Sequence, residues 1–312
     1  MSNVIILPWL TVENANAVAG LTWGFPAITH FLGYTHALSR KLQASHGLRL
    51  EGCAVICHHH QVHAHSSGRD YQFALTRNPL TREGKTASFN EEGRMHLTVS
   101  LLLECDGEIA NGEIGLRELA THMQTLCQTQ KLAGGTITGL RNVQVCSASG
   151  IKPLLYGLMP GFVLLDRSSL LDEHYQQLRQ LNPQAEKIDA WLDFAALKMA
   201  AEGGEQSGDA ATWNYQGKPF PGYLVPLMTG WQRISPLYEA GSVMNARDEE
   251  TPFCFAEAVY GVGEWRGAHR IKELTELFWR YHTTESGYYC RGQALSDDEP
   301  DEDEDPRNFD DF

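Results

Sequence analysis

Residues 3–64 alternate between strand-like and helix-like apolar patterns, and this alternation restricts the fold more than any other feature. Residues 3–12, NVIILPWLTV, are β-branched and apolar and predict a buried strand. Apolar positions recur at helical intervals from about Ala27 to the His46–Gly47 pair, which predicts a helix. A second strand is expected from about Leu50 to Ala64. This succession favours an α+β fold.

A polar insertion follows the second expected strand. Residues 68–94 are rich in turn-forming residues and lie between two short apolar stretches, which predicts a protruding hairpin. Residues 96–104 then have a strand-like pattern. Residues 116–130 predict a helix, which the glycines of KLAGGTI directly after it should end.

The second half of the chain predicts three more helices and one clear strand. The strand is expected at 160–167, followed by a helix over 168–181. A helix should start at Pro183 and run through 185–200, before a flexible connector at 202–212. The last helix is expected at 268–282, after strand-and-turn material.

The net charge is distributed unevenly along the chain. The 312 residues carry −14, but residues 297–312 hold ten acids and one arginine, a net −9, which leaves −5 for the other 296. An acidic tail of this composition cannot build a core, so it should be disordered. A mildly acidic body lacks the clustered cations that support non-specific nucleic-acid binding, so any RNA contact must be local and shaped.

The remaining composition indicates one large domain over residues 1–296, with the acidic tail at 297–312. Apolar residues make up 42% of the chain, enough for a sizeable core. The seven cysteines form no CxxC pair, which fits a reducing cytoplasm. We expect no signal peptide and no membrane span.

No catalytic or metal motif is present. The sequence contains no GxSxG, HExxH, GxxxxGK[ST] or strand-to-helix GxGxxG segment, so no cofactor is expected. The histidines at 58–65 could place His63 and His65 on one face of a strand as zinc ligands, but no third ligand is visible. We therefore expect no metal site, and a solvated or interface strand instead.

Three segments are candidates for binding phosphate or bases. The polar insertion carries cationic and amide donors suited to an RNA backbone, although a solvated hairpin explains them equally well. The KLAGGTI segment offers backbone N–H groups beside a lysine, although two glycines after a helix are usually only a cap. The third segment gathers cations around an expected helix N-terminus, and aromatic residues at turns could stack bases. The candidates are Arg77, Asn78, Arg82 and Lys85 in the first segment, Lys131, Gly134 and Gly135 in the second, Arg247, Arg266, His269 and Arg270 in the third, and the aromatic Trp23.

Taken together, these segments resemble a known family, the Csy-type members of the Cas five group, over about residues 3–282. The resemblance is carried by ILPWLTVENANAVAGLTWGFP, FLGYTHAL, LTRNPLTREGKTASFNEEGRMHLTVSLLL, KLAGGTI, LMPGFVLL and SPLYEAGSVMNARDEETPFCFAEAVYGVGEW. Arg94, in the EEGR segment, is counted with the RNA-binding candidates.

The resemblance implies a ferredoxin-like palm of the RNA-recognition-motif type with an inserted thumb at about 68–100. It also implies a non-catalytic subunit of the type I-F CRISPR surveillance complex in antiviral defence. Such a subunit would hold the 5′ handle of the CRISPR RNA with the large Csy subunit, near the backbone Csy subunits and the target DNA. The main alternative is a CRISPR RNA-processing endoribonuclease with His96 or His122 as general base. A metabolic α/β enzyme is disfavoured by the lack of a cofactor loop.

Overall fold

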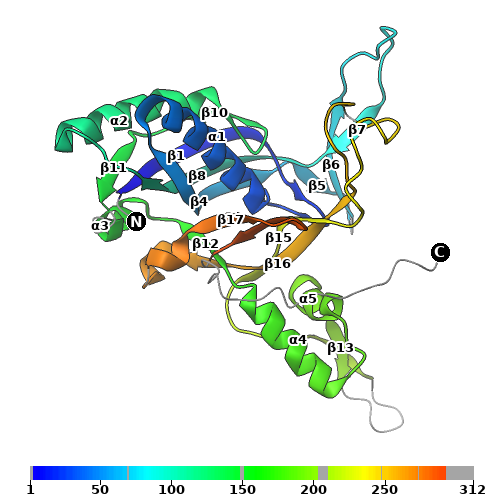
Figure 1. Cartoon of the computed structure of the whole chain (residues 1–312). Coiled ribbons are helices and arrows are strands. Elements are labelled where there is room, and N and C mark those ends of the chain that lie inside the picture. The colour runs from blue at the N-terminus through cyan, green and yellow to red at the C-terminus, as the bar shows by residue number, and fades with distance from the viewer. Residues whose placement is uncertain are drawn as a thin grey trace.

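The computed structural model describes residues 3–68, 70–147, 151–202, 210–246, 248–272 and 274–292. The N-terminal half forms an antiparallel sheet in the spatial order β4-β8-β1-β10. Helix α1 leads from β1 to β4, and α2 leads from β8 to β10, so both connections return over the sheet (Figure 1). The elements are β1 (Asn3–Asn16), α1 (Ile28–His46), β4 (Arg49–Val62), β8 (Arg94–Asp106), α2 (Gly112–Leu126) and β10 (Gly135–Gly139). The expected strand–helix–strand start is confirmed.

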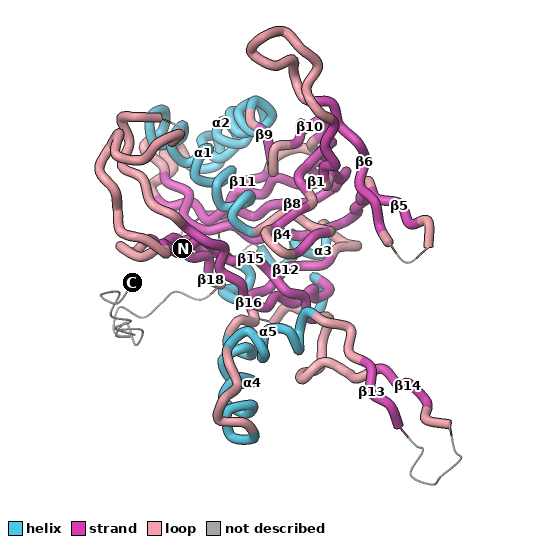
Figure 2. Tube along the Cα trace, turned by 90° about the vertical axis from the view of Figure 1, so that its right-hand side faces the viewer, coloured by secondary structure: helices cyan, strands magenta, loops and turns pink. Residues whose placement is uncertain are grey.

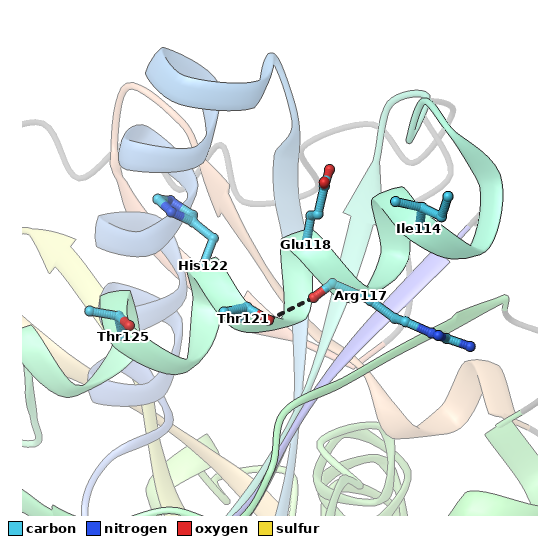
Figure 3. Close-up of a pocket in the computed structure, with 6 residues that line it drawn as sticks. All are labelled: Ile114, Arg117, Glu118, Thr121, His122 and Thr125. Atoms are coloured by element: carbon cyan, nitrogen blue, oxygen red, sulfur yellow. Dashed lines mark hydrogen bonds between the residues drawn. The ribbon is translucent and has the colours of Figure 1, made fainter.

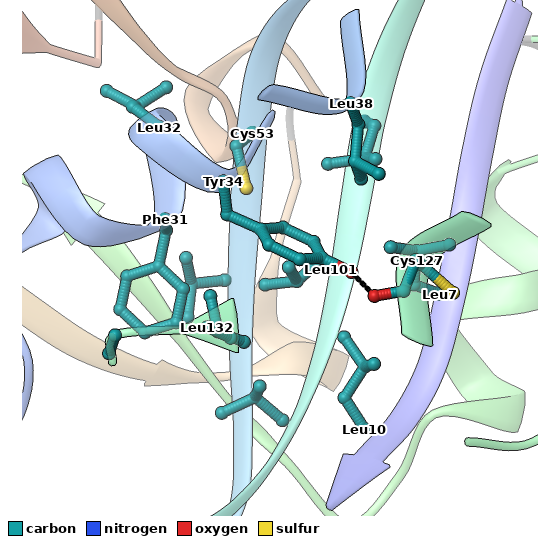
Figure 4. Close-up of a cluster of buried hydrophobic side chains, with 14 of the residues drawn as sticks. Leu7, Leu10, Phe31, Leu32, Tyr34, Leu38, Cys53, Leu101, Cys127 and Leu132 are labelled. Carbon is teal, nitrogen blue, oxygen red and sulfur yellow. Dashed lines mark hydrogen bonds between the residues drawn. The ribbon is translucent and has the colours of Figure 1, made fainter. Parts of the chain in front are cut away.

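Alternating side chains give this sheet two buried faces. Ile5 and Leu7 of β1 belong to the core beneath α1 and α2, whereas Val4 and Ile6 pack in a separate cluster on the other side. Because successive residues of a strand point to opposite faces, a continuous apolar strand is what a sheet covered on both sides requires. Figure 4 shows the first core, where Tyr34 of α1 lies among leucines of the sheet.

The polar insertion forms a hairpin that projects from one end of the sheet, as the sequence predicts (Figures 1 and 2). We call residues 71–92 the projecting hairpin. Its two strands, β6 (Tyr71–Arg77) and β7 (Phe89–Glu92), pair with each other. Strand β5 (Ala64–Ser66) precedes the hairpin and pairs with β6, which gives the order β5-β6-β7. Residues 94–100, which the expected thumb range includes, lie in central strand β8, where they pair with β1 and β4.

The second half closes a ring of strands against the first. One edge of β4 pairs with β17 at Cys53 and with β12 at Cys57, and β16, β15 and β18 connect those two strands. The Nε1 of Trp279 donates to the carbonyl of Leu164 inside this ring, at 2.8 Å. The strands are β12 (Phe162–Asp166), β15 (Leu224–Arg233), β16 (Ala256–Gly267), β17 (Trp279–Thr283) and β18 (Gly287–Arg291).

The remaining elements complete the surface. Helices α4 and α5 pack together and, with the β13–β14 ribbon, extend from the end of the molecule opposite the projecting hairpin (Figure 2). These elements and the other short ones are β2 (Val18–Ala19), β3 (Thr22–Trp23), β9 (Lys131–Leu132), β11 (Gln144–Ser147), α3 (Ile151–Gly157), α4 (Ser169–Leu181), α5 (Lys187–Ala195), β13 (Met199–Glu202) and β14 (Thr212–Tyr215). Within the described ranges, no helix has both the length and the apolar character needed to cross a bilayer.

Three helix predictions need correction. The expected last helix, 268–282, is two short 3₁₀ turns, Ala268–Arg270 and Leu274–Leu277, followed by β17. Phe278 and Trp279 are buried on opposite sides of the sheet. Consecutive residues of an extended chain point to opposite faces in this way, whereas the buried residues of an amphipathic helix share one face. The helix expected from Pro183 begins only at Lys187. Most of the 202–212 connector and the whole acidic tail lie outside the described residues.

The third correction concerns KLAGGTI, which is a β-hairpin and not a helix cap. Helix α2 ends at Leu126 and is followed by a 3₁₀ turn, Cys127–Thr129. Strands β9 and β10 then pair across a turn at Ala133 and Gly134, both of which have positive φ (49° and 75°). Two consecutive positive φ values are typical of tight hairpin turns, and this explains the glycine.

Candidate nucleic-acid interface

The projecting hairpin exposes three cations. Arg77, Arg82 and Lys85 are exposed, and within the described ranges none forms an ion pair with a carboxylate. The guanidinium of Arg77 lies 5.0 Å from the ring centroid of Phe89 on the facing strand. The side-chain amide of Asn78 donates to the carbonyl of Ser88, at 3.4 Å. The hairpin also holds Glu83, Glu91 and Glu92, so its net charge is zero, and it offers these three exposed cations as local donors away from the body of the protein.

Arg94 lies where the projecting hairpin joins the sheet. It faces Asn16 of β1 in the strand register, and its guanidinium donates to a Glu92 carboxylate oxygen at 2.6 Å. A β-carbon built on Gly134 would lie 3.9 Å from Nη1 of Arg94, so the β9–β10 turn and Arg94 are neighbours. The structure thus brings Arg94 and Gly134 together at the base of the hairpin.

Gly135 has a packing role. A β-carbon there would lie 2.7 Å from the carbonyl oxygen of Glu13 and 2.8 Å from the amide nitrogen of Ala15. The glycine therefore lets β10 approach β1 closely. Lys131, on β9, is exposed.

Aromatic side chains form a patch beside this junction. Trp23 is 46% exposed and lies with its ring centroid 5.4 Å from those of Tyr71 and Phe73, which belong to the projecting hairpin. Base stacking on exposed aromatic rings is worth about 1–3 kcal/mol per base and tolerates any sequence. The patch continues the hairpin surface with groups that suit unpaired bases.

A largely apolar pocket of about 610 Å³ opens next to Trp23. Phe25 and Trp265 pack edge to face inside it, 4.9 Å apart, so they anchor the pocket wall. Phe162 and Tyr223 also line it and are 58% and 71% exposed. Phe162 and Tyr223 could not be predicted as neighbours from the sequence, because they are isolated aromatics in separate segments.

The other cationic candidates lie elsewhere or are occupied. Arg266 bonds to Glu264 at 2.7 Å and lies 3.8 Å from Glu276, so carboxylates already neutralise it. His269 and Arg270 belong to a three-residue 3₁₀ turn and not to a helix N-terminus. In Figure 1 this turn lies near α3, away from the projecting hairpin. Arg247 is outside the described residues.

The histidine run is divided among separate environments. His58 stacks on Trp9, His60 lines the aromatic pocket, and the ring of His63 lies 4.2 Å from that of His96. Among the described residues, no three His, Cys, Asp or Glu side chains are grouped so that they could hold a metal ion.

His96 and His122, the candidate bases of the endoribonuclease alternative, lie in different surroundings. The ring of His122 on α2 lies 4.7 Å from that of His46 on α1. Figure 3 shows His122 with Glu118 and Thr121, which line the same pocket. Burial and the charge of His46 lower the pKa of His122. His96 accepts from the amide N–H of Asn14 at 3.3 Å, near the base of the projecting hairpin. His96 belongs to β8 and His122 to α2, and His96 does not line the pocket beside His122.

Fold and surface together define an α+β protein with a helix-covered antiparallel sheet, a projecting hairpin with three exposed cations, and an adjacent, largely apolar pocket. The family model described as CRISPR-associated protein (Cas_Csy2) matches residues 5–290. The chain is also similar to CRISPR-associated protein Csy2 of Pseudomonas aeruginosa strain UCBPP-PA14, with 38% identity over 301 residues, covering 89% of this chain and 91% of that protein. The chain belongs to the Csy2 family of CRISPR-associated proteins, the second Csy subunit of type I-F systems. The resemblance found in the sequence is confirmed.

Proposed function

We propose that this chain is a non-catalytic subunit of the type I-F CRISPR RNA-guided surveillance complex. In this proposal it acts in the cytoplasm in antiviral defence and binds the 5′ handle of the CRISPR RNA together with the large Csy subunit. The backbone Csy subunits and the target DNA are its further neighbours in the assembled complex. The observation that carries the proposal is the projecting hairpin, with Arg77, Arg82 and Lys85 exposed on an otherwise acidic chain.

The fold part of the proposal is a ferredoxin-like palm with an inserted thumb. Support comes from the element order β1-α1-β4-β8-α2-β10 and the spatial order β4-β8-β1-β10, with both helices over one face. The projecting hairpin, inserted between β4 and β8, is the proposed thumb. A rigid palm with a protruding thumb could hold a bent single strand between the hairpin and the aromatic patch.

The non-catalytic part is supported by chemistry. RNA cleavage without a metal requires a positioned base and acid close to the same phosphate. His96 and His122 are the candidate bases, and they lie on different elements, β8 and α2. Glu118 lines the same open pocket as His122, but within the described residues no hydrogen bond joins the two side chains. The geometry favours holding RNA over cutting it.

The test combines Arg77→Ala with Arg82→Ala in a complex co-expressed with the other Csy subunits and guide RNA. Each lost charge-assisted hydrogen bond costs roughly 1.5–3 kcal/mol, so RNA retention should fall at least about tenfold per arginine. The matched control combines Arg117→Ala with Arg179→Ala, two arginines on helices α2 and α4 outside the proposed interface. RNA content, complex yield and the thermal melt are measured for both.

An unaltered complex with the hairpin variant would remove these arginines from the RNA site. A collapsed melting transition in the hairpin variant alone would instead assign them a structural role.

A further inference from the structure

The indole of Trp9 is held in position at a cost to the chain. Trp9 has a positive φ of 56° and lies where the pairing of β1 with β8 shifts register, between Leu7 and Leu10. A positive φ is an outlier for so bulky a residue. The indole Nε1 is also buried without a hydrogen-bond acceptor in the described part of the chain, which adds a further cost. Strained residues cluster at binding sites, so Trp9 indicates a role beyond packing.

Two planar groups cover the two faces of this indole. The imidazole of His58 stacks on one face, and hydrogen bonds to Pro160 and Ser100 fix it there. The guanidinium carbon of Arg141 lies over the same indole, 4.1 Å from the ring centroid. Because His58 fills the first face, Arg141 lies on the second. His58, Trp9 and Arg141 thus form a column of three planar groups, which we call the Trp9 stack.

The Trp9 stack ends in a free cation. Arg141 is exposed, and within the described residues it forms no ion pair with a carboxylate. Its backbone N–H donates to the carbonyl of Pro8 at 3.0 Å, which ties its loop to β1. A guanidinium that lies on an indole keeps its other face and its N–H edge free, so a further planar group can stack on it.

A pocket of about 460 Å³ opens beside Arg141. Pro153 and Leu154 of α3 give it an apolar side, and the exposed residues Asn142 and Gln144 line it next to Arg141. Neither side-chain amide takes part in a hydrogen bond among the described residues. In Figure 1, α3 and the projecting hairpin lie at opposite ends of the sheet, so this pocket is separate from the proposed handle site.

The chemistry of the pocket favours one kind of occupant. A nucleobase is planar and can stack on a guanidinium, which would add a fourth layer to the Trp9 stack. Side-chain amides both donate and accept hydrogen bonds, as the edges of a base require. The charge of Arg141 also favours the phosphate that accompanies a base. A carboxylate of an acidic peptide would use that charge, but it would leave the guanidinium face and the apolar side of the pocket without a partner.

We propose that this pocket binds one unstacked base of a single-stranded nucleic acid. The base stacks on Arg141, and its edge bonds to the amides of Asn142 and Gln144. This site goes beyond the proposed function, because the pocket and the projecting hairpin lie at opposite ends of the sheet and contact different stretches of a strand. RNA and DNA share the chemistry that the site uses, so the test includes both.

NMR on the isolated full chain tests the proposal through the Nε–Hε signal of Arg141, which is assigned by its loss in Arg141→Lys. A base stacked on the guanidinium moves this signal upfield through its ring current, whereas an anion bonded to it moves the signal downfield. The probes are hexaadenylate RNA, its DNA counterpart, tripolyphosphate as an anion without a base, and hexaglutamate as an acidic peptide.

Both nucleic acids should move the signal upfield, and the one that binds more tightly identifies the preferred strand. Half-saturation should occur at a concentration about tenfold lower than for tripolyphosphate, as the stacking of one base allows. A downfield shift with equal half-saturation for tripolyphosphate would reduce the site to an anion site and overturn the proposal. Tighter binding of hexaglutamate would also overturn it and assign the pocket to a protein partner, and so would the absence of a shift with every probe.

Variants separate this pocket from the projecting hairpin. Asn142→Ala combined with Gln144→Ala should raise the half-saturation concentration of hexaadenylate about fivefold, because neutral hydrogen bonds to the base are lost. Gln177→Ala, at an exposed amide of α4, is the matched control and should change nothing. Arg77→Ala combined with Arg82→Ala should leave the Arg141 titration unchanged, so the outcome is independent of RNA binding by the projecting hairpin. Thermal melts check that each variant is folded, and an unchanged titration in the folded amide variant would overturn the proposed contact with the base edge.

Discussion

The imidazole of His58 stacks on the indole of Trp9, with ring centroids 3.9 Å apart and planes inclined by 10°. Its Nδ1 donates to the carbonyl of Pro160 at 2.8 Å, because that oxygen can only accept. In the neutral ring with this tautomer, Nε2 accepts from the hydroxyl of Ser100 at 2.7 Å, and that oxygen accepts from the amide N–H of Trp9 at 2.9 Å. Burial favours this neutral form of His58.

The neutral His58 predicts a pH dependence of stability. Burial lowers the pKa of His58, and the charge of Arg141 lowers it further, against a smaller rise from the bond to Pro160. Because the unfolded chain binds the proton more readily, the free energy of unfolding should fall as the pH drops below about 6.5. His58→Phe keeps the stacking and removes the titration, so its stability should depend less on pH between 7 and 5. Urea unfolding at pH 7 and pH 5 measures the free energy of unfolding of both proteins. An equal change in this free energy between the two pH values for His58→Phe and for the unaltered protein would refute the prediction.

The hydroxyl of Tyr34 forms a buried hydrogen bond, and its loss should lower the stability of the fold. Its hydroxyl donates to the carbonyl of Cys127 at 3.0 Å and connects α1 to the end of α2 within the core (Figure 4). Tyr34→Phe removes the shorter of two hydrogen bonds to that carbonyl, which also accepts from the amide N–H of Gln130 at 3.4 Å, so the free energy of unfolding should decrease by about 1 kcal/mol. Tyr156→Phe, at a side chain that is 62% exposed, is the matched control and should change little. Equal effects of the two substitutions would contradict the assigned bond.

The two glycines of the β9–β10 turn should differ in their tolerance. Gly135→Ala places a methyl group against the backbone of β1 and should cost about 1–3 kcal/mol of stability. Gly134→Asn meets no crowding and keeps a residue that tolerates positive φ, so its effect should be small. Chemical denaturation compares the two variants. Similar losses at both positions would mean that β10 does not pack on β1 as described.

The chain should not cleave RNA. Purified protein incubated with repeat-containing RNA should leave the RNA intact, since no base and acid are positioned around a common phosphate in the described residues. Gel analysis of the RNA over time measures this. Specific cuts that disappear with His96→Ala or His122→Ala would instead support the endoribonuclease alternative.

Local patterns predicted the first half of the fold well. The apolar run at 3–12 and the helical spacing before Gly47 correspond to β1 and α1, because both elements bury a face that their own period defines. The insertion at 68–94 was recognisable because a polar, turn-rich stretch between strands cannot enter a core.

Contacts between residues far apart in the sequence explain why the helix at 268–282 and the role of Arg266 were predicted wrongly. Leu274, Leu277 and Phe278 match a helical stripe, but Trp279 is drawn into a strand by pairing with Cys53, more than two hundred residues earlier. No local pattern carries that information. Similarly, Arg266 could be recognised as a cation from the sequence, but its neutralisation by Glu276 depends on the folded chain.

The most direct test maps RNA on the surface of the assembled complex. A guide RNA with photoreactive 4-thiouridine in its 5′ handle is irradiated in the complex, and crosslinked peptides of this chain are identified by mass spectrometry. We predict crosslinks within residues 71–92 and at the neighbouring Trp23, where cations and exposed rings lie together. Crosslinks confined to the α4–α5 end of the molecule, or none to this chain, would contradict its proposed role in holding the CRISPR RNA.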